Sequence, residues 1–168
     1  DYVFDGSSPV AYKEGDQPNP KSVYGATKLA GEIACLKNCP ESIIIRTAWV
    51  YSEFGNNFVK TMLRLMSERD TLGVVNDQVG SPTYAADLAQ VILTILDSKK
   101  WQAGIYHYSN AGEISWYDFA QDIKEIAHKT CEIKGIPASS YPTPAERPAY
   151  SLLDKSKIKA VYDIDAVD

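Results

Sequence analysis

The stretch VYGATKLAGEIACLKNCPESIIIRTAWVY, residues 23–51, decides the fold class of this chain. Its first part, from about Val23 to Lys37, has helical apolar spacing, and Asn38-Cys39-Pro40 ends the helix. Residues 42–51 form a short and nearly continuous apolar run, which is typical of a strand buried on both faces of a parallel sheet. A helix joined to such a strand by a short turn is half of an α/β unit.

Further helices and strands follow this unit along the chain. The apolar spacing predicts helices over residues 57–69, 85–96, 115–129 and 155–160, with Ser115 as an N-cap, and strands over residues 72–75 and 104–109. The remaining segments, residues 5–22, 77–84 and 136–148, are rich in Gly, Pro and small polar residues and are expected to be loops. Helices that alternate with strands predict an α/β fold.

Composition limits the classes of function that fit the chain. It has 168 residues, of which 45% are hydrophobic and 23% charged, as in an ordinary globular domain. A net charge of -5 argues against a nucleic-acid partner, and no apolar run approaches the roughly 20 residues that span a bilayer. The cysteines Cys35, Cys39 and Cys131 are odd in number and irregular in spacing, so we expect packing roles, no metal site and a reducing cytoplasm.

Tyr24 and Lys28 are the best candidates for a catalytic pair. They lie four residues apart, so their side chains project from the same face of the expected helix. A cation within about 4–6 Å lowers the pKa of a phenol from its usual value near 10. Such a phenol is able to donate a proton to a carbonyl oxygen while hydride reaches the carbon. By itself the spacing is more often that of an amphipathic helix with an incidental Tyr and Lys.

Three other residues have two interpretations each. Trp49 follows the expected buried strand and is equally suited to a core position or to an aromatic surface for a ligand. Arg147 lies in a Pro-rich loop, where it could meet a phosphate bidentately or remain a solvated surface charge. His107 alternates with two tyrosines in a strand, which favours a structural histidine over a catalytic one.

Five segments in one order extend the evidence around Tyr24 and Lys28. They are residues 1–6 (DYVFDG), 24–32 (YGATKLAGE), 57–59 (NFV), 77–83 (DQVGSPT) and 147–154 (RPAYSLLD). Together they resemble the dTDP-4-dehydrorhamnose reductases, a family of extended short-chain dehydrogenases/reductases. The resemblance implies the C-terminal portion of a Rossmann-like parallel sheet with helices, plus a small α/β substrate-binding lobe at about 51–84 and 110–154, within a single piece of 1–168.

The resemblance also implies a reaction and roles for named residues. The reaction is the reduction of dTDP-4-dehydro-L-rhamnose to dTDP-L-rhamnose with NADPH or NADH in the cytoplasm. Tyr24 would be the general acid, and Lys28 would tune it and hydrogen-bond the nicotinamide ribose, so both residues also touch the cofactor. Asp1, Tyr2 and Trp49 match positions near the sugar nucleotide, and Arg147 is a candidate for its phosphates. Mg²⁺ and a homodimer are compatible with the family, but no motif assigns metal ligands.

Residues outside this sequence would complete the site. By the resemblance, the Ser or Thr of the catalytic triad stands immediately before Asp1, and no glycine-rich phosphate loop occurs among the ten glycines. We therefore expect a C-terminal fragment that alone neither binds NADPH tightly nor turns over.

Two alternative functions stay open at this point. The first is a nucleotide-sugar epimerase or dehydratase of the same extended family, against which Gly80-Ser81-Pro82-Thr83 and Arg147-Pro148 favour the reductase. The second is a non-catalytic protein like the regulatory subunit of methionine adenosyltransferase, against which the presence of Tyr24 and Lys28 favours an enzyme.

Overall fold

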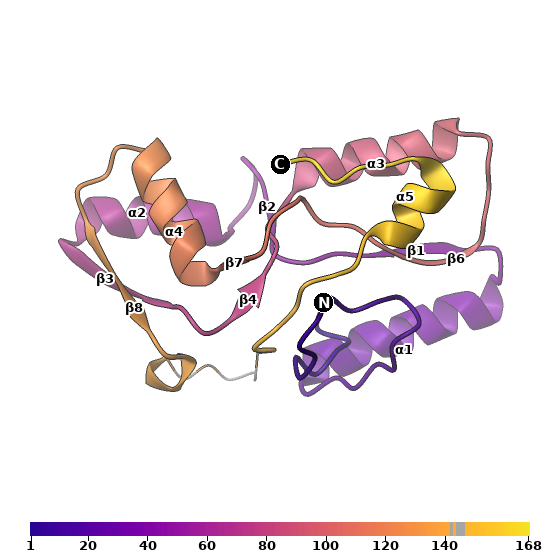
Figure 1. Cartoon of the computed structure of the whole chain (residues 1–168), viewed down its shortest axis with the longest axis horizontal. Helices are drawn as coiled ribbons and strands as arrows, with labels where there is room; N and C mark the ends of the chain where they lie inside the picture. Colours follow the sequence, from indigo (N-terminus) through magenta and orange to yellow (C-terminus); the bar gives the residue numbers. More distant parts are fainter. Residues whose placement is uncertain (142, 144–146) are drawn as a thin grey trace.

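The computed structural model of the chain describes residues 1–141, 143 and 147–168, and its elements form two bodies (Figure 1). The larger body holds β1 (Ile43–Arg46), β6 (Gly104–His107), α1 (Val23–Asn38), α3 (Ala85–Asp97) and α5 (Ser156–Tyr162). The smaller body holds β3 (Thr71–Val75), β8 (Glu132–Ile136), α2 (Phe58–Glu68), α4 (Trp116–Ile126) and the 3-10 helix η1 (Ala138–Ser140). Short strands complete the fold: β2 (Val50–Tyr51), β4 (Val79–Gly80), β5 (Thr83–Tyr84) and β7 (Ile114–Ser115).

A parallel pair of strands lies at the centre of each body. β1 pairs with β6, with Ile43 opposite Gly104, and β3 pairs with β8, with Thr71 opposite Glu132. The short strands add a parallel pair, β2 with β5, and an antiparallel pair, β4 with β7. Helices and other strands separate the members of each long pair in sequence, as a parallel crossover requires. This arrangement confirms the expected α/β class.

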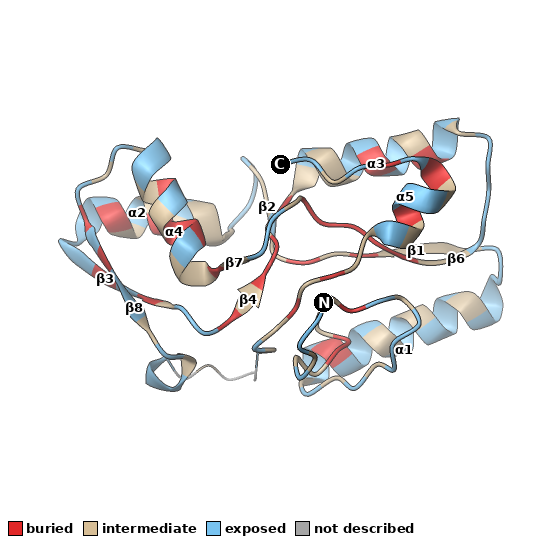
Figure 2. Ribbon diagram, in the orientation of Figure 1, coloured by how far each residue is buried: buried red, intermediate tan, exposed pale blue. Residues whose placement is uncertain are grey.

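The two faces of the β1–β6 pair are covered very differently. α3 and α5 pack on one face, and α1 lies on the other (Figure 1). The face toward α3 and α5 has a buried core made by Val91, Ile95, Tyr106, Tyr108, Ile158, Tyr162 and Ile164. Of the 16 residues of α1, by contrast, only Gly25 is buried, and most of the helix is exposed (Figure 2). α1 is therefore held at a few points rather than by a broad apolar face.

The core of the smaller body is contributed by α2, α4, β3 and β8. Its buried residues are Met62, Met66, Leu72, Val74, Phe119, Ala120, Ile123, Cys131 and Ile133. α4 begins at a complete capping box, in which the Ser115 hydroxyl and the Asp118 carboxylate each bond the other's backbone nitrogen. Such a box satisfies two backbone donors at the start of a helix, and it confirms Ser115 as the N-cap.

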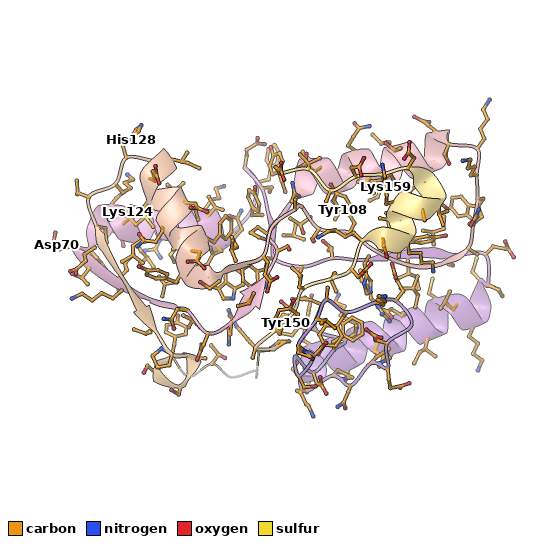
Figure 3. The ribbon with its side chains drawn as sticks, viewed as in Figure 1. Asp70, Tyr108, Lys124, His128, Tyr150 and Lys159 are labelled. Atoms are coloured by element: carbon orange, nitrogen blue, oxygen red, sulfur yellow. The ribbon has the colours of Figure 1, made fainter. Side chains whose placement is uncertain are left out.

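The segment after residue 149 connects the two bodies. Tyr150, near the middle of the molecule in Figure 3, forms a bridge with Val79 of β4. Three residues later Leu153, which is 1% exposed, forms a bridge with Tyr12 of the N-terminal loop. Backbone hydrogen bonds from this one segment thus fix β4 of the junction against the loop beside α1.

All the helices expected from the sequence are present, with ends that differ by a few residues. The single strand expected over residues 42–51 is wrong, because the chain breaks after Arg46 and resumes as β2 at Val50. Trp49 has a φ of 47°, which a strand cannot contain. Nor is this strand buried on both faces, since Ile43, Ile44 and Ile45 are only half-buried.

The expected loops contain more strand than the sequence indicated. Residues 77–84 hold β4 and β5, and β8 was missed. β8 reads EIKGI, whose mixed polar and apolar residues carry a weak strand signal of their own. The loop expected over residues 136–148 contains η1 at its start and lies partly outside the described residues.

The cysteines separate into two groups. Cys131 is buried in the core of the smaller body, as expected of a packing residue. Cys35 and Cys39 are exposed at the end of α1, so the expectation that they are packing residues is wrong. All three are free thiols. Within the described part of the chain, no helix has both the length and the apolar character to cross a membrane.

Gly25 fixes the start of α1 against the N-terminal turn. A Cβ at this position would lie 2.1 Å from the Tyr2 carbonyl oxygen, so the helix approaches as closely as it does only because the residue is glycine. We expect Gly25→Ala to lower the free energy of unfolding by about 1–3 kcal/mol through overpacking. Gly31→Ala is the matched control, because nothing lies within 4 Å of its Cβ. It should instead stabilise the same helix by about 0.5–1 kcal/mol.

Urea unfolding of both variants measures the two effects. An unchanged midpoint for Gly25→Ala would contradict the close contact with Tyr2.

Candidate active site

Tyr24 and Lys28 lie on the first turns of α1 with their side chains close together. Ser22 caps the helix by accepting a hydrogen bond from the Gly25 nitrogen at 3.1 Å. The Lys28 ammonium stands 5.3 Å from the centre of the Tyr24 ring. Tyr24 is 56% exposed, so much of this residue is open to a ligand. The pair expected from sequence spacing is therefore a pair in space.

The N-terminal turn adds Asp1 and Tyr2 to this cluster. The Tyr2 ring meets the Tyr24 ring edge-on, with 5.3 Å between centroids. The main-chain nitrogen of Asp1 donates to the Thr47 carbonyl at 2.9 Å, directly after β1 ends. The four residues thus gather outside the carboxyl end of β1, which is where open α/β sheets bind ligands.

Trp49 occupies the junction of the two bodies. Its ring stacks on the Trp116 ring of α4, with centroids 3.6 Å apart and planes 12° from parallel. A Cβ on Gly80 would lie 2.9 Å from the Trp49 ring, so glycine is needed beside it. Trp49 packs against the core of the smaller body and against a buried cluster that includes Phe4, Tyr12 and Leu153. One face of this ring is therefore filled by Trp116, and a sugar would have to use another part of it.

Arg147 lines a cavity in the smaller body, away from Tyr24 and Lys28. The cavity has a volume of about 580 Å³. All five residues of β3, Thr71–Val75, line it, and within the described part of the chain this strand pairs with β8 alone. Aromatic rings and polar groups form much of the rest, among them Phe58, Trp116, Tyr141, Arg69, Gln78 and Arg147. Trp116 both lines this cavity and stacks on Trp49, so the cavity borders the Trp49–Trp116 pair.

Some residues of this cavity were missed as site residues. Phe58 and Trp116 have the helical spacing of core residues, and the structure uses them both in the core and as cavity lining. Gln78, in a segment expected to be a loop, is only 9% exposed. The feature of the sequence that could have identified Gln78 as a site residue was its place in the DQVGSPT segment, residues 77–83.

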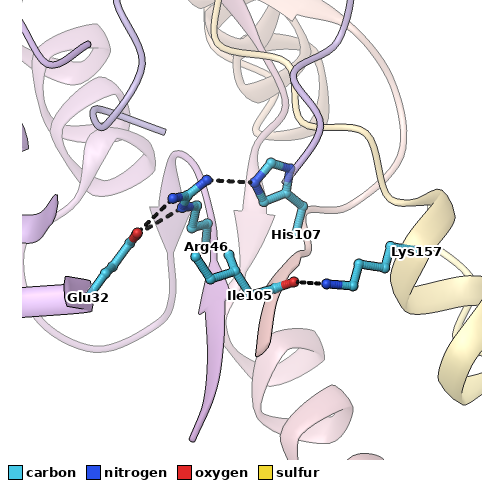
Figure 4. Close-up of polar contacts among 5 residues, drawn as sticks. All are labelled: Glu32, Arg46, Ile105, His107 and Lys157. Carbon is cyan, nitrogen blue, oxygen red and sulfur yellow. Dashed lines mark hydrogen bonds and ion pairs between the residues drawn. The ribbon is translucent and has the colours of Figure 1, made fainter. Parts of the chain in front are cut away.

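A buried polar network ties α1 to the sheet at Glu32, one helical turn after Lys28 (Figure 4). Arg46 of β1 donates to both carboxylate oxygens of Glu32, from Nε at 2.9 Å and from Nη2 at 2.7 Å. Its Nη1 faces Nε2 of His107 at 3.5 Å. His107 is fully buried, and its Nδ1 lies 3.0 Å from the Tyr12 carbonyl. Nearby, the Lys157 ammonium donates to the Ile105 carbonyl at 2.6 Å.

His107 is uncharged in this network. Burial, followed by the neighbouring Arg46 guanidinium, lowers its pKa to about 3. The neutral ring then donates from Nδ1 to Tyr12 and presents the Nε2 lone pair to Arg46. The structure thus confirms His107 as a satisfied structural residue.

This lowered pKa makes stability depend on pH. An unfolded chain protonates His107 near pH 6.5, the ordinary value, whereas the folded chain does not until about pH 3. The contribution is therefore complete above pH 6.5 and is lost as the pH falls toward 3, at about 1.4 kcal/mol per pH unit. Between about pH 6.5 and pH 4.5, His107→Gln should lose roughly 2 kcal/mol less stability than the native chain.

Urea unfolding at several pH values tests this difference. His128→Gln is the control, because His128 is exposed at the end of the smaller body (Figure 3). Equal pH slopes for His107→Gln and the native chain would refute a neutral buried His107.

Metal ligands are the remaining question about the site. Among the described residues, no group of three or more His, Cys, Asp or Glu side chains is placed to hold a metal ion.

The parallel α/β fold and the Tyr24–Lys28 helix at the end of β1 define an extended short-chain dehydrogenase/reductase type of protein. Comparison with known proteins narrows the class. The family model described as the RmlD substrate binding domain matches residues 1–168, and the chain belongs to this family.

Individual relatives agree with the family. A dTDP-4-dehydrorhamnose reductase of Aggregatibacter actinomycetemcomitans is 46% identical, and the match covers 100% of this chain and 60% of that protein. The crystal structure of such a reductase from Clostridium acetobutylicum superimposes with a TM-score of 0.93 at 42% identity, over 99% of this chain and 59% of that one. The Bacillus anthracis reductase, solved in complex with NADP, gives 0.89 at 40% identity, over 95% and 55%. The chain thus spans about 60% of the length of the relatives it matches.

Proposed function

We propose that this chain forms the substrate-binding part and supplies the general acid of a dTDP-4-dehydrorhamnose reductase. The reaction is the reduction of the 4-keto group of dTDP-4-dehydro-L-rhamnose to the alcohol of dTDP-L-rhamnose. The observation that carries the proposal is the exposed Tyr24–Lys28 pair at the carboxyl end of β1. The names of the relatives at 43–46% identity support the substrate.

Tyr24 moves the proton in this reaction. As hydride adds to the carbonyl carbon, the carbonyl oxygen gains negative charge and takes the proton of the Tyr24 hydroxyl. Lys28, within reach of the Tyr24 ring, stabilises the phenolate that remains. Tyr2, edge-on to Tyr24, limits the directions from which a keto group reaches the hydroxyl.

NADPH or NADH supplies the hydride when it is bound. The residues present here fit one edge of that cofactor, because Lys28 makes no hydrogen bond or ion pair with another described residue and Tyr24 is more than half exposed. Their polar atoms are thus free to bind a ribose hydroxyl. Nothing among the described residues resembles a phosphate loop for the rest of the cofactor.

The smaller body is proposed to hold the nucleotide end of the substrate. Among the described residues β3 pairs with β8 alone, so the backbone groups of its other edge would be available to the hydrogen-bonding edge of a pyrimidine base. Phe58 and Trp116 offer aromatic surface for stacking. Arg147 and Arg69 bring positive charge for the diphosphate. The sugar would then extend past Trp49 toward Asp1, Tyr2 and Tyr24.

Binding of dTDP to this chain tests the nucleotide site directly. We expect saturable binding of dTDP by calorimetry, and Arg147→Ala should weaken it by about 10–100-fold through loss of a charge-assisted hydrogen bond. Arg64→Ala is the matched control, because Arg64 is an exposed arginine of α2 that pairs with Glu68 and does not line the cavity. NADPH should bind more weakly than the micromolar range. No saturation by dTDP, or equal effects of the two substitutions, would refute the nucleotide site.

A further inference from the structure

Glu32 continues the line of side chains that begins with Tyr24 and Lys28. The three residues are spaced i, i+4 and i+8, so they lie on one face of α1. Side chains of opposite charge four residues apart on a helix attract each other. Lys28 therefore has two possible partners: the Tyr24 phenol on its N-terminal side and the Glu32 carboxylate on its C-terminal side.

Arg46 decides between these two partners. It occupies both oxygens of Glu32 in a bidentate contact, at 2.9 and 2.7 Å, and the two side chains are only 4% and 11% exposed. A bidentate pair fixes direction as well as distance. The carboxylate is thus drawn toward the sheet, and Lys28 stands over the Tyr24 ring at 5.3 Å.

Arg46 is itself held from other sides. The Phe4 ring lies 5.1 Å from its guanidinium carbon. The uncharged His107 faces Nη1 with a lone pair, so it adds no repulsion. Because His107 is in turn bonded to the Tyr12 carbonyl, the guanidinium cannot turn away from Glu32 without breaking the network.

We propose that Arg46 is a positioning residue for the Tyr24–Lys28 pair, because its hold on Glu32 keeps that carboxylate away from Lys28. The proposal rests on the proposed function, in which Lys28 serves Tyr24. Without Arg46, the freed carboxylate pairs with Lys28 and cancels the positive charge that the phenolate needs. The catalytic loss then comes from Glu32, and removing its charge as well should reverse it.

A purely structural role for Arg46 makes the opposite prediction. α1 has a single buried residue, so the Glu32–Arg46 contact also helps to hold the helix on the sheet. If that were its whole contribution, the double variant Arg46→Met/Glu32→Gln would be no more active than Arg46→Met. The two roles therefore predict different effects of adding Glu32→Gln to Arg46→Met. Activity recovers if Arg46 positions the pair, and it does not recover if the role of Arg46 is purely structural.

Activity is measured in a fusion enzyme, in which this chain is joined to the part of the 46% identical relative that it does not match. We expect Arg46→Met to lower kcat by about tenfold or more with little change in KM, because the phenolate loses the stabilisation by Lys28. The double variant should recover most of this loss, and Glu32→Gln alone should lose less than Arg46→Met. A double variant as slow as Arg46→Met, or slower, overturns the proposal.

A structural measurement on the chain itself separates this proposal from the proposed function. In a crystal structure of the Arg46→Met chain, the Glu32 carboxylate should lie within about 4 Å of the Lys28 ammonium, an ion-pair distance. A carboxylate that stays away from Lys28 overturns the proposal, whatever the fusion enzyme catalyses. Arg46→Lys is the second variant to test if Arg46→Met does not fold. It keeps a cation at this position but replaces the bidentate contact with a single one. It should show a smaller loss, again reversed by Glu32→Gln.

Discussion

Replacing Tyr24 with phenylalanine is expected to lower the rate of keto-sugar reduction by about 10²–10⁴-fold, the usual contribution of a general acid. The substitution removes one hydroxyl and keeps the ring that meets Tyr2 edge-on, so the fold and the binding of dTDP should persist. The loss should therefore appear in kcat rather than in KM. The measurement is NADPH oxidation by the fusion enzyme with dTDP-4-dehydro-L-rhamnose.

Tyr117→Phe is the matched control for this experiment. Tyr117 lies on α4, and its hydroxyl accepts a hydrogen bond from Gln121 at 2.7 Å, outside the candidate site. It should keep the native rate. A native rate in the Tyr24→Phe enzyme would exclude Tyr24 as the acid and would leave the family assignment intact, because that assignment depends on the whole chain.

Loss of Arg46 should also have a large effect on stability. Breaking a buried ion pair by removing one partner typically costs about 3–5 kcal/mol, and a contact of the freed Glu32 carboxylate with the exposed Lys28 would return only a small part of that. Glu32 keeps some contact with solvent, so we expect Arg46→Met to fall near the lower end of that range. Replacing both partners with residues of similar size should cost far less, because no charge is left behind. Urea unfolding of this chain measures both variants.

The exposed pair on α2 provides the comparison. Arg64 and Glu68 lie 2.8 Å apart, but their side chains are 60% and 51% exposed. Arg64→Met should therefore change the free energy of unfolding by no more than about 0.5 kcal/mol. Similar losses for Arg46→Met and Arg64→Met would show that burial of the first pair has no energetic consequence.

Periodicity was sufficient to predict the helices and the α/β class. The apolar spacing of α2 and α4 is clear, and Asn57 and Ser115 stand where a helix cap is needed. The strands were harder to predict, because the break after Arg46 depends on the backbone of Trp49, which adopts a positive φ where its ring packs between Trp116 and Gly80. That constraint comes from residues far away in the sequence.

In the candidate site, too, contacts within one helix could be predicted and contacts between distant segments could not. Tyr24 and Lys28 could be placed together from their spacing, because both lie on one helix. The cavity beside Arg147 could not be predicted, since it needs β3, α2 and η1 to come together from three separate segments. Arg46 and Glu32 were not singled out either. Their contact depends on the packing of α1 against the sheet, so the sequence around Arg46 does not identify its partner. The roles assigned to Asp1, Tyr2, Trp49 and Arg147 stay predictions.

The stacked indoles of Trp49 and Trp116 give this protein a built-in optical reporter. Two indole rings 3.6 Å apart couple their electronic transitions, so the pair should produce a split signal in circular dichroism and quench its own fluorescence. The chain has three tryptophans, and the remaining one, Trp101, lies elsewhere, beside α3. Because one ring belongs to each side of the junction, a ligand that shifts either side would change this signal without any added dye.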